Sequence, residues 1–296
     1  MTDTSGRADK VGAVRGRTDS GWSWGGFMGD DPRDMARLFE LTALGGDVFV
    51  ADSPSVGRPR LFGGQVAGQA LRAACRTADG RPPHSLHAYF IRPGAPEEPL
   101  RFEVARTRDG RSFSTRHVTA SQGGKPILEL IASFHDPEDG FDWQPPGPSG
   151  TPAPEDLPEH WTPPGFSRHP DGFEVRVVDP PGEGGSPSPH PFWIRADRPV
   201  GDDPALHACL LAYLSDMGVV SSARAPGSPR RLATAVTLDH AMWFHRPPRA
   251  DRWLLYSVEP ATNHGARGLA RGTLHTADGT LVASIAQEAL LRPAAG

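Results

Sequence analysis

The sequence predicts an α+β fold in which two similar halves each wrap an antiparallel sheet around a central helix. Two segments, one rich in glycine and alanine and one apolar, have the length and composition of buried helices. Each is followed by long runs with the alternation of strands, joined by tight turns that contain glycine. The two sets of elements occur in the same order, so we expect two sheets that can join edge to edge.

Composition divides the chain into four parts. Residues 1–33 are polar and rich in Gly, Arg and Asp, and we expect a disordered tail. Residues 34–136 are expected to form an N-terminal unit, which opens within an amphipathic stretch over residues 32–44. Residues 137–172 are crowded with Pro and Gly, which is typical of a linker, and residues 173–292 are expected to form a C-terminal unit.

The first half contains a predicted helix over residues 63–75. Its glycines would let a sheet close tightly on it, and its N-terminus could present N–H groups to an anion or a carbonyl, although packing is the simpler explanation of the glycines. An Arg92-Pro93 turn and a Gly123-Gly124 turn separate runs that alternate as strands do. The predicted strands cover residues 84–93, 100–107, 112–121 and 126–135.

The second half repeats this plan. A strand is predicted over residues 173–178, and a helix over 203–218 with Asp203 as N-cap, Pro in its first turn and Gly218 at its end. An Arg-Pro turn at residues 246–247 and an Asp-Gly turn at 278–279 then match the two turns of the first half. The predicted strands cover residues 236–245, 253–259, 265–276 and 280–291.

Composition and motifs exclude several classes of protein. The chain of 296 residues carries a net charge of −4 with scattered basic residues, which argues against nucleic acid as a partner. Cys75 and Cys209 form no C-x-x-C pair, so we expect a reducing compartment and neither a disulfide framework nor a zinc site. The apolar runs are too short to span a bilayer, and we expect a cytoplasmic protein without membrane insertion.

Familiar catalytic signatures are missing from the sequence. It contains no G-x-S-x-G elbow, no G-x-G-x-x-G after a strand, no P-loop and no H-E-x-x-H. His240 and His245 would lie on opposite faces of one strand, which is poor geometry for sharing a metal ion. The sequence therefore predicts no metal and no organic cofactor.

Gln287 is the most informative single residue. It lies in the middle of a strand face that is otherwise apolar, so its amide is expected to be buried and must find polar partners there. A satisfied core amide that fixes the strand register is one interpretation. A catalytic amide is the other, and the strand pattern alone favours the first. The apolar face consists of Leu281, Ala283, Ile285, Ala289 and Leu291.

Two further polar residues are candidates for chemistry. Asp216 is predicted in the last helical turn, where the helix dipole disfavours an anion, yet helical spacing places it on an apolar flank. A solvated Asp at a helix end is the ordinary alternative. Thr237 opens the next strand, and a period of two puts it on the same face as Asp239, so spacing cannot choose between them. Aligning the repeated turns places only Pro83 and Ala132 opposite Thr237 and Gln287.

Several long motifs resemble the acyl-CoA thioesterase II family, and they occur in order from about residue 33 to 292. They are Leu61-Phe-Gly-Gly-Gln-Val-Ala-Gly-Gln-Ala, His87-Ala-Tyr-Phe-Ile-Arg-Pro-Gly, Thr237-Leu-Asp-His-Ala-Met-Trp-Phe-His-Arg-Pro and Val282-Ala-Ser-Ile-Ala-Gln-Glu. The resemblance implies a double hot-dog fold and hydrolysis of acyl-CoA thioesters. It also implies that a water molecule is held and activated by Asp216, Thr237 and Gln287.

The resemblance carries further expectations. Asp216 would take the proton of the water, while Thr237 and Gln287 would position it. Gly63, Gly64, Gln65 and Trp243 are the candidates for substrate binding, and the chain is expected to form a homo-oligomer that acts in fatty acid and lipid metabolism. Two alternatives stay open: a hydratase or dehydratase on the same fold, against which the missing Asp-x-Asn-Pro-x-His segment argues, and a catalytically silent acyl-CoA-binding accessory protein.

Overall fold

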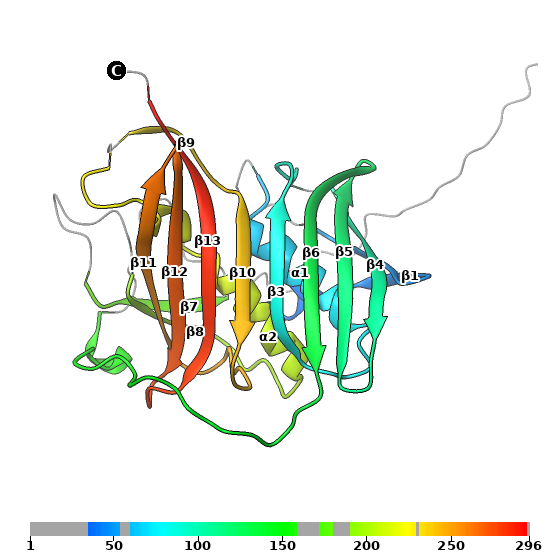
Figure 1. Cartoon of the computed structure of the whole chain (residues 1–296), viewed down its shortest axis with the longest axis horizontal. Coiled ribbons are helices and arrows are strands. Elements are labelled where there is room, and N and C mark those ends of the chain that lie inside the picture. The colour runs from blue at the N-terminus through cyan, green and yellow to red at the C-terminus, as the bar shows by residue number, and fades with distance from the viewer. Residues whose placement is uncertain are drawn as a thin grey trace, which may run out of the picture. The chain divides into compact units, whose positions relative to one another are not determined.

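The computed structural model describes residues 35–53, 60–96, 98–158, 172–179, 190–228 and 231–294. The predicted tail over residues 1–33 lies outside these ranges. The described chain forms one antiparallel sheet of 13 strands, in the order β1-β2-β4-β5-β6-β3-β10-β13-β12-β11-β8-β7 with β9 paired to β13 (Figure 1). From the first half come β1 (Thr42–Gly45), β2 (Val48–Ala51), β3 (Pro83–Phe90), β4 (Leu100–Asp109), β5 (Phe113–Gln122) and β6 (Lys125–His135).

The second half supplies the other strands and repeats the order of the first outward from the centre of the sheet. These strands are β7 (Phe173–Val177), β8 (Phe192–Ala196), β9 (Leu232–Thr237), β10 (Asp239–Phe244), β11 (Leu254–His264), β12 (Arg267–Thr276) and β13 (Leu281–Pro293). At the centre β3 pairs with β10, where His240 lies opposite Ala88. The sheets of the two halves therefore join edge to edge, as the repeat predicts.

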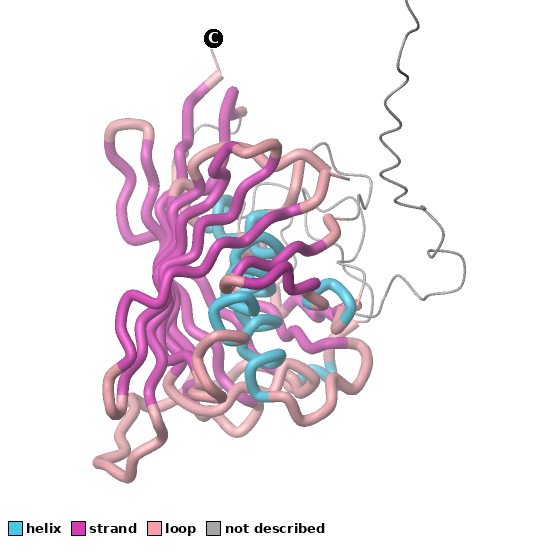
Figure 2. Tube along the Cα trace, turned by 90° about the vertical axis from the view of Figure 1, so that its right-hand side faces the viewer, coloured by secondary structure: helices cyan, strands magenta, loops and turns pink. Residues whose placement is uncertain are grey.

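Two helices form the core beneath the sheet. They are α1 (Gly63–Cys75) and α2 (Pro204–Leu214), and Figure 2 shows both on one side of the strands. Residues Leu206–Leu214 of α2 are all buried, which fits a helix that is apolar all round. Asp203 caps α2, since its side chain accepts the N–H of Ala205. The first helix has the predicted bounds, and the second ends earlier than predicted.

The two helices run antiparallel and touch through glycines of α1. A Cβ atom on Gly64 would lie 2.2 Å from the carbonyl oxygen of Tyr213, and one on Gly68 would lie 2.8 Å from that of Cys209. Any larger residue would hold the helices apart, because 2.2 Å is far inside van der Waals contact. Close packing against α2 therefore explains these two glycines.

Short elements depart from the prediction. The described part of the 32–44 stretch forms only a 3₁₀ turn, η1 (Arg37–Phe39), before β1 begins. The short strands β1, β2 and β8 were not expected, because four or five residues give too little alternation for a pattern to show. A short helix, α3 (Val219–Ser222), follows Gly218, which caps its N-terminus with a φ of 75°.

A bulge at Leu238 breaks the strand that the sequence predicts over residues 236–245. Ala241 lies opposite Ala286 and Thr237 opposite Ala289, so four residue steps on one strand face three on β13. One extra residue reverses the alternation of side chains. The side chain of Thr237 therefore turns to the same inner side as that of His240.

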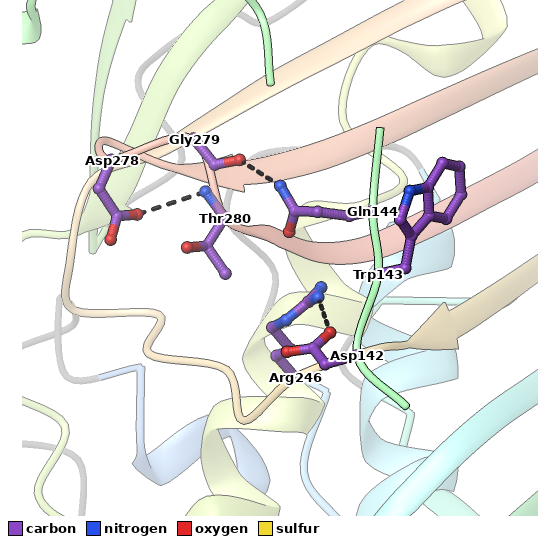
Figure 3. Close-up of a pocket in the computed structure, with 7 residues that line it drawn as sticks. All are labelled: Asp142, Trp143, Gln144, Arg246, Asp278, Gly279 and Thr280. Carbon is purple, nitrogen blue, oxygen red and sulfur yellow. Dashed lines mark hydrogen bonds and ion pairs between the residues drawn. The ribbon is translucent and has the colours of Figure 1, made fainter. Parts of the chain in front are cut away.

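Part of the predicted linker packs on the second half. Gln144 accepts the Leu281 N–H over 2.9 Å and donates to the Gly279 carbonyl over 2.8 Å. Asp142 pairs with Arg246. Figure 3 shows this pair and the contact of Gln144 with Gly279 beside an open pocket of about 420 Å³. A segment without regular secondary structure is thus tied to the turn between β12 and β13 and to the Arg-Pro turn. The η2 turn (Pro154–Asp156) follows.

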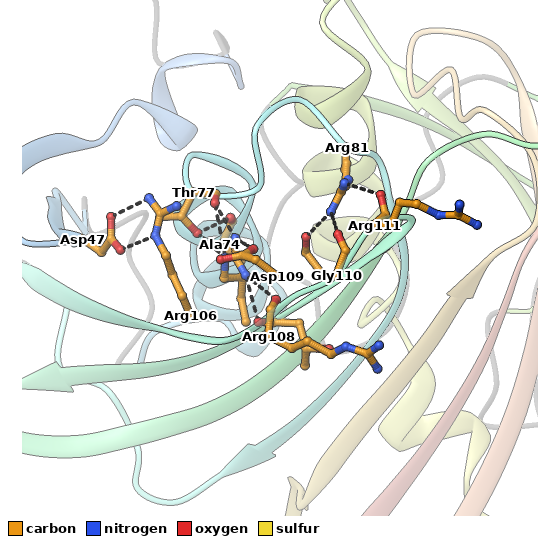
Figure 4. Close-up of polar contacts among 12 residues, drawn as sticks. Asp47, Ala74, Thr77, Arg81, Arg106, Arg108, Asp109, Gly110 and Arg111 are labelled. Carbon is orange, nitrogen blue, oxygen red and sulfur yellow. Dashed lines mark hydrogen bonds and ion pairs between the residues drawn. The ribbon is translucent and has the colours of Figure 1, made fainter.

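A fully buried arginine anchors the first half. Arg116 on β5 donates to the Thr77 carbonyl, to the carbonyls of Arg108 and Thr115, and to the carboxylate of Asp109. These partners join the end of α1 to the turn between β4 and β5, and Figure 4 shows several of them. Because every edge of the guanidinium meets an acceptor, its charge is tolerated in the core.

Candidate active site

The structure brings Asp216, Thr237 and Gln287 together. Thr237 Oγ1 donates to Asp216 Oδ1 over 3.4 Å, and Gln287 Nε2 donates to Thr237 Oγ1 over 3.0 Å. Asp216 is 8% exposed and Gln287 is fully buried. Three polar groups from the end of α2, from β9 and from β13 thus meet in the core of the second half. The 3.4 Å contact is longer than an ordinary O–H···O hydrogen bond.

Asp216 lies two residues beyond α2, which ends at Leu214, and not in its last turn as predicted. Its Oδ2 accepts the backbone N–H of Gly64 over 2.9 Å. That N–H belongs to the first turn of α1, where the free N–H groups and the helix dipole favour an anion. The carboxylate is therefore stabilised by the N-terminus of α1, and the unfavourable helix end assumed from the sequence does not apply.

The bulge decides between Thr237 and Asp239. Thr237 faces the cluster, whereas the Asp239 carboxylate accepts the backbone N–H of Glu288 over 2.7 Å at the bulge. Burial raises the pKa of Asp239, and this hydrogen bond opposes the effect. The Asp239 carboxylate thus replaces a backbone hydrogen-bond acceptor that is missing from the strand pairing at the bulge. It has no contact with the other site residues.

Gln287 is held at its other end by a histidine. Its Oε1 lies 2.6 Å from His240 Nδ1, and His240 Nε2 lies 2.9 Å from Ser215 Oγ. Burial lowers the pKa of His240 to about 4, although the bond to Gln287 opposes this. Tyr256, whose hydroxyl donates to the Ser215 carbonyl, has a raised pKa because it is buried and because Asp216 is near.

The structure places some of the candidate substrate-binding residues near Asp216 and another away from it. Gly63 and Gly64 adjoin Asp216, because a Cβ atom on Gly63 would lie 2.8 Å from Asp216 Oδ2. Gln65 follows them, is 5% exposed, and its Nε2 has no hydrogen-bond partner among the described residues. Trp243 lies on the outer face of β10, 37% exposed with its ring against His87. The structure does not bring Trp243 to the cluster.

Sequence reasoning missed His240 and Ser215. His240 occupies an inward position of β10 beside the buried Met242, so it stands out on an apolar face as Gln287 does on β13. That pattern was the available signal. Ser215 gives none, since a serine after a helix is ordinary.

Other features lie apart from this cluster. The pocket beside Arg246 contains none of Asp216, Thr237 and Gln287. Over the described ranges, no group of three or more His, Cys, Asp and Glu side chains could hold a metal ion. No helix in the described part of the chain is long and apolar enough to cross a membrane.

The arrangement suits the activation of water. A buried carboxylate can accept a proton, and a neighbouring hydroxyl and amide can orient the molecule that gives it up. Two family profiles match the chain: the acyl-CoA thioesterase C-terminal domain over residues 145–291 and the acyl-CoA thioesterase N-terminal domain over residues 50–135.

Known proteins resemble most of the chain. Human acyl-coenzyme A thioesterase 8 is 36% identical over 90% of this chain and 93% of its own length. The crystal structure of an acyl-CoA thioesterase II from Mycobacterium marinum has a TM-score of 0.73 and 38% identity, covering 88% of this chain and 97% of that one. A hot-dog-fold protein from Alicyclobacillus acidocaldarius, 19% identical, covers 88% and 98% with a TM-score of 0.68, which shows the fold alone.

The fold and these similarities define a double hot-dog enzyme that hydrolyses thioesters. Within that class, the chain belongs to the acyl-CoA thioesterase II family.

Proposed function

We propose that the protein hydrolyses fatty acyl-CoA to a free fatty acid and CoA, with a water molecule activated by Asp216 and held by Thr237 and Gln287. The observation that carries this proposal is the partly buried hydrogen-bonded series from Gln287 Nε2 through Thr237 Oγ1 to Asp216 Oδ1. Catalytic contacts are often long in the absence of substrate, and the 3.4 Å contact at Asp216 fits a place where water enters.

The reaction needs one proton acceptor and one leaving group. Asp216 takes a proton as the water oxygen attacks the thioester carbonyl carbon, and the C–S bond then breaks. The proton passes to the departing CoA thiolate, which leaves the carboxylate ready for a second turnover. Thr237 and Gln287 orient the water, which lowers the entropic part of the barrier.

The N-terminus of α1 is where we place the thioester carbonyl. The helix dipole favours the developing oxyanion there, and Gln65, in the first turn of the same helix, has a buried Nε2 without a hydrogen-bond partner among the described residues. Gly63 leaves room there for the Asp216 carboxylate, whereas the contact with the Tyr213 carbonyl accounts for Gly64. The position of Trp243 on the outer face of the sheet does not support a role in substrate binding.

The test is thiol release from a panel of short to long acyl-CoAs. Asp216→Asn is expected to keep the fold and to lower kcat by about 100-fold or more, since it removes the proton acceptor. Asp239→Asn is the matched control, because it changes a neighbouring carboxylate that does not contact the cluster, and it should keep wild-type kcat.

Other outcomes discriminate among the alternatives. A wild-type protein that binds acyl-CoA without releasing thiol would indicate the accessory protein, and hydration of an enoyl-CoA without thiol release would indicate the hydratase. Equal losses in Asp216→Asn and Asp239→Asn would refute the assigned base.

The outer face of the sheet supports self-association. Exposed apolar side chains gather on β3, β6 and β10, where His87 lies opposite both Ile131 and Ala241. The exposed apolar residues there include Tyr89, Ile131 and Trp243. We propose that a second copy covers this face, and light scattering that shows a monomer would contradict it. The cytoplasmic location and the unit boundaries at residues 136 and 173 stay predictions from the sequence.

A further inference from the structure

We propose that His240 is a positioning residue for the hydrolysis: its Nδ1–H fixes the orientation of the Gln287 amide, and thereby directs the Thr237 hydroxyl hydrogen to Asp216. This inference rests on the proposed function of Asp216, Thr237 and Gln287. His240 itself does not touch the reacting atoms, because Gln287 and Thr237 lie between it and the carboxylate.

The hydrogen bonds form one directed series. Gln287 Oε1 has no hydrogen, so at 2.6 Å it can only accept from His240 Nδ1. With Oε1 held in this way, the amide presents its Nε2 to Thr237 Oγ1 at 3.0 Å. The hydroxyl then accepts from the amide and keeps its own hydrogen for Asp216 Oδ1.

The opposite amide orientation would break this series. Oε1 would then face Thr237 and take its hydroxyl hydrogen, and Asp216 Oδ1 would lose that donor. An imidazole protonated only on Nε2 would favour this orientation, since its Nδ1 could only accept. The position of one hydrogen on His240 therefore decides where the Thr237 hydrogen points.

The surroundings of His240 keep its ring neutral and in contact with Ser215. Burial lowers its pKa to about 4, so the ring is neutral near pH 7 and carries a single N–H. The ring is 1% exposed, and Ser215 Oγ lies 2.9 Å from its Nε2. That hydroxyl also lies 3.0 Å from the Ala212 carbonyl oxygen, so its single hydrogen must turn from this carbonyl to Nε2 in the form protonated on Nδ1. The Tyr256 hydroxyl in turn donates to the Ser215 carbonyl, which fixes the segment after α2.

The duplicated half shows that the fold does not require these polar groups. Aligned by the repeated turns, His240 corresponds to Leu86 and Gln287 to Ala132, and these two residues lie opposite each other between β3 and β6. Both are fully buried in an apolar environment. The same place in the sheet is therefore stable without hydrogen bonds, which favours a functional reason for the polar pair.

The test compares two substitutions of His240. His240→Leu introduces the residue found in the other half and removes the donor, and kcat is expected to fall by about 10- to 100-fold with KM nearly unchanged. His240→Asn places an amide Nδ2–H where Nδ1–H stood, and it should recover most of kcat. His275→Asn, a buried histidine of β12 without a contact to the cluster, is the matched control and should keep wild-type kcat.

Non-additivity separates positioning from a general loss of structure. If His240 acts through Gln287, the double variant His240→Leu/Gln287→Ala should be no slower than Gln287→Ala alone. Independent, multiplying losses would overturn the inference, and so would a His240→Leu enzyme with wild-type kcat. If the wild-type enzyme hydrolyses acyl-CoA and Asp216→Asn does not, either of these two outcomes rejects the role of His240 and leaves the proposed function intact.

A measurement on the wild-type protein tests the hydrogen position on His240 without depending on whether a variant folds. Nitrogen NMR of ¹⁵N-histidine-labelled protein distinguishes the two neutral tautomers, and at pH 7 we expect a buried ring protonated on Nδ1 alone. If no buried histidine shows this form, the inference is wrong even if the enzyme is active. The same spectrum tests the geometry if acyl-CoA hydrolysis is not found.

Discussion

Replacing Gly64 with alanine should separate the two central helices beside the active site. The new Cβ atom would lie 2.2 Å from the Tyr213 carbonyl oxygen, whereas ordinary contact begins at 3.4 Å, so the backbones must part by about 1.2 Å. Overpacking costs about 1–3 kcal/mol, and alanine returns about 1 kcal/mol of helix propensity. We expect a net loss of about 1 kcal/mol, or about 2–4 °C in Tm for a chain of this size.

The same shift should slow catalysis, because the Gly64 N–H holds Asp216 Oδ2 over 2.9 Å. Losing this contact should lower kcat by about tenfold. Gly68→Ala is the matched control, since its Cβ atom would lie 2.8 Å from the Cys209 carbonyl oxygen, one turn away from the carboxylate. It should lower Tm by less and leave kcat near the wild-type value. Thermal unfolding and steady-state kinetics measure both quantities, and a Gly64→Ala enzyme with unchanged Tm and kcat would refute the close contact.

Two further predictions concern stability. Arg116→Met should lower the free energy of unfolding by about 2–4 kcal/mol in urea denaturation, since buried carbonyls lose their donors, whereas Arg106→Lys, which alters an exposed pair with Asp47, should cost less than about 1 kcal/mol. For His240, the folded pKa of about 4 lies below the usual 6.5, so the unfolded chain binds the proton first and stability is lost as pH falls from 6.5 towards 4. This contribution should reach about 2–3 kcal/mol at pH 4.5, and an equal pH dependence in folded His240→Asn would contradict it.

The sequence predicts the parts of the fold that are long and periodic. The helix over residues 63–75 has the predicted bounds because its run of glycine and alanine is distinctive, although no side chain caps its start. Strand β8 was missed because its five residues are nearly all apolar and give no alternation. The bulge at Leu238 leaves no trace in composition, because one extra residue changes the side that each later residue faces without changing which residues are present.

The sequence identifies a site residue where the pattern around that residue predicts a buried polar group. Gln287 is such a residue, because an amide within an apolar strand face must meet a polar partner. Asp216 and Thr237 do not, since each is ordinary in its own element and only the resemblance to the family selected them. Their partnership depends on where α2 ends and where β9 bends, and both features depend on tertiary contacts.

The duplication explains why one half can hold a buried polar cluster at all. The joined sheet and the two packed helices supply the apolar burial, and the place between β3 and β6 that corresponds to the cluster is filled by Leu86 and Ala132 alone. Burying the polar side chains of Gln287 and His240 in the second half costs free energy. The apolar burial shared by the two halves offsets this cost. The Asp216 carboxylate also depends on both halves, because Asp216 follows the helix of the second half but accepts an N–H from the helix of the first. A single half would keep the contact of Asp216 Oδ1 with Thr237 but would leave Asp216 Oδ2 without the Gly64 N–H, so the complete site requires both halves.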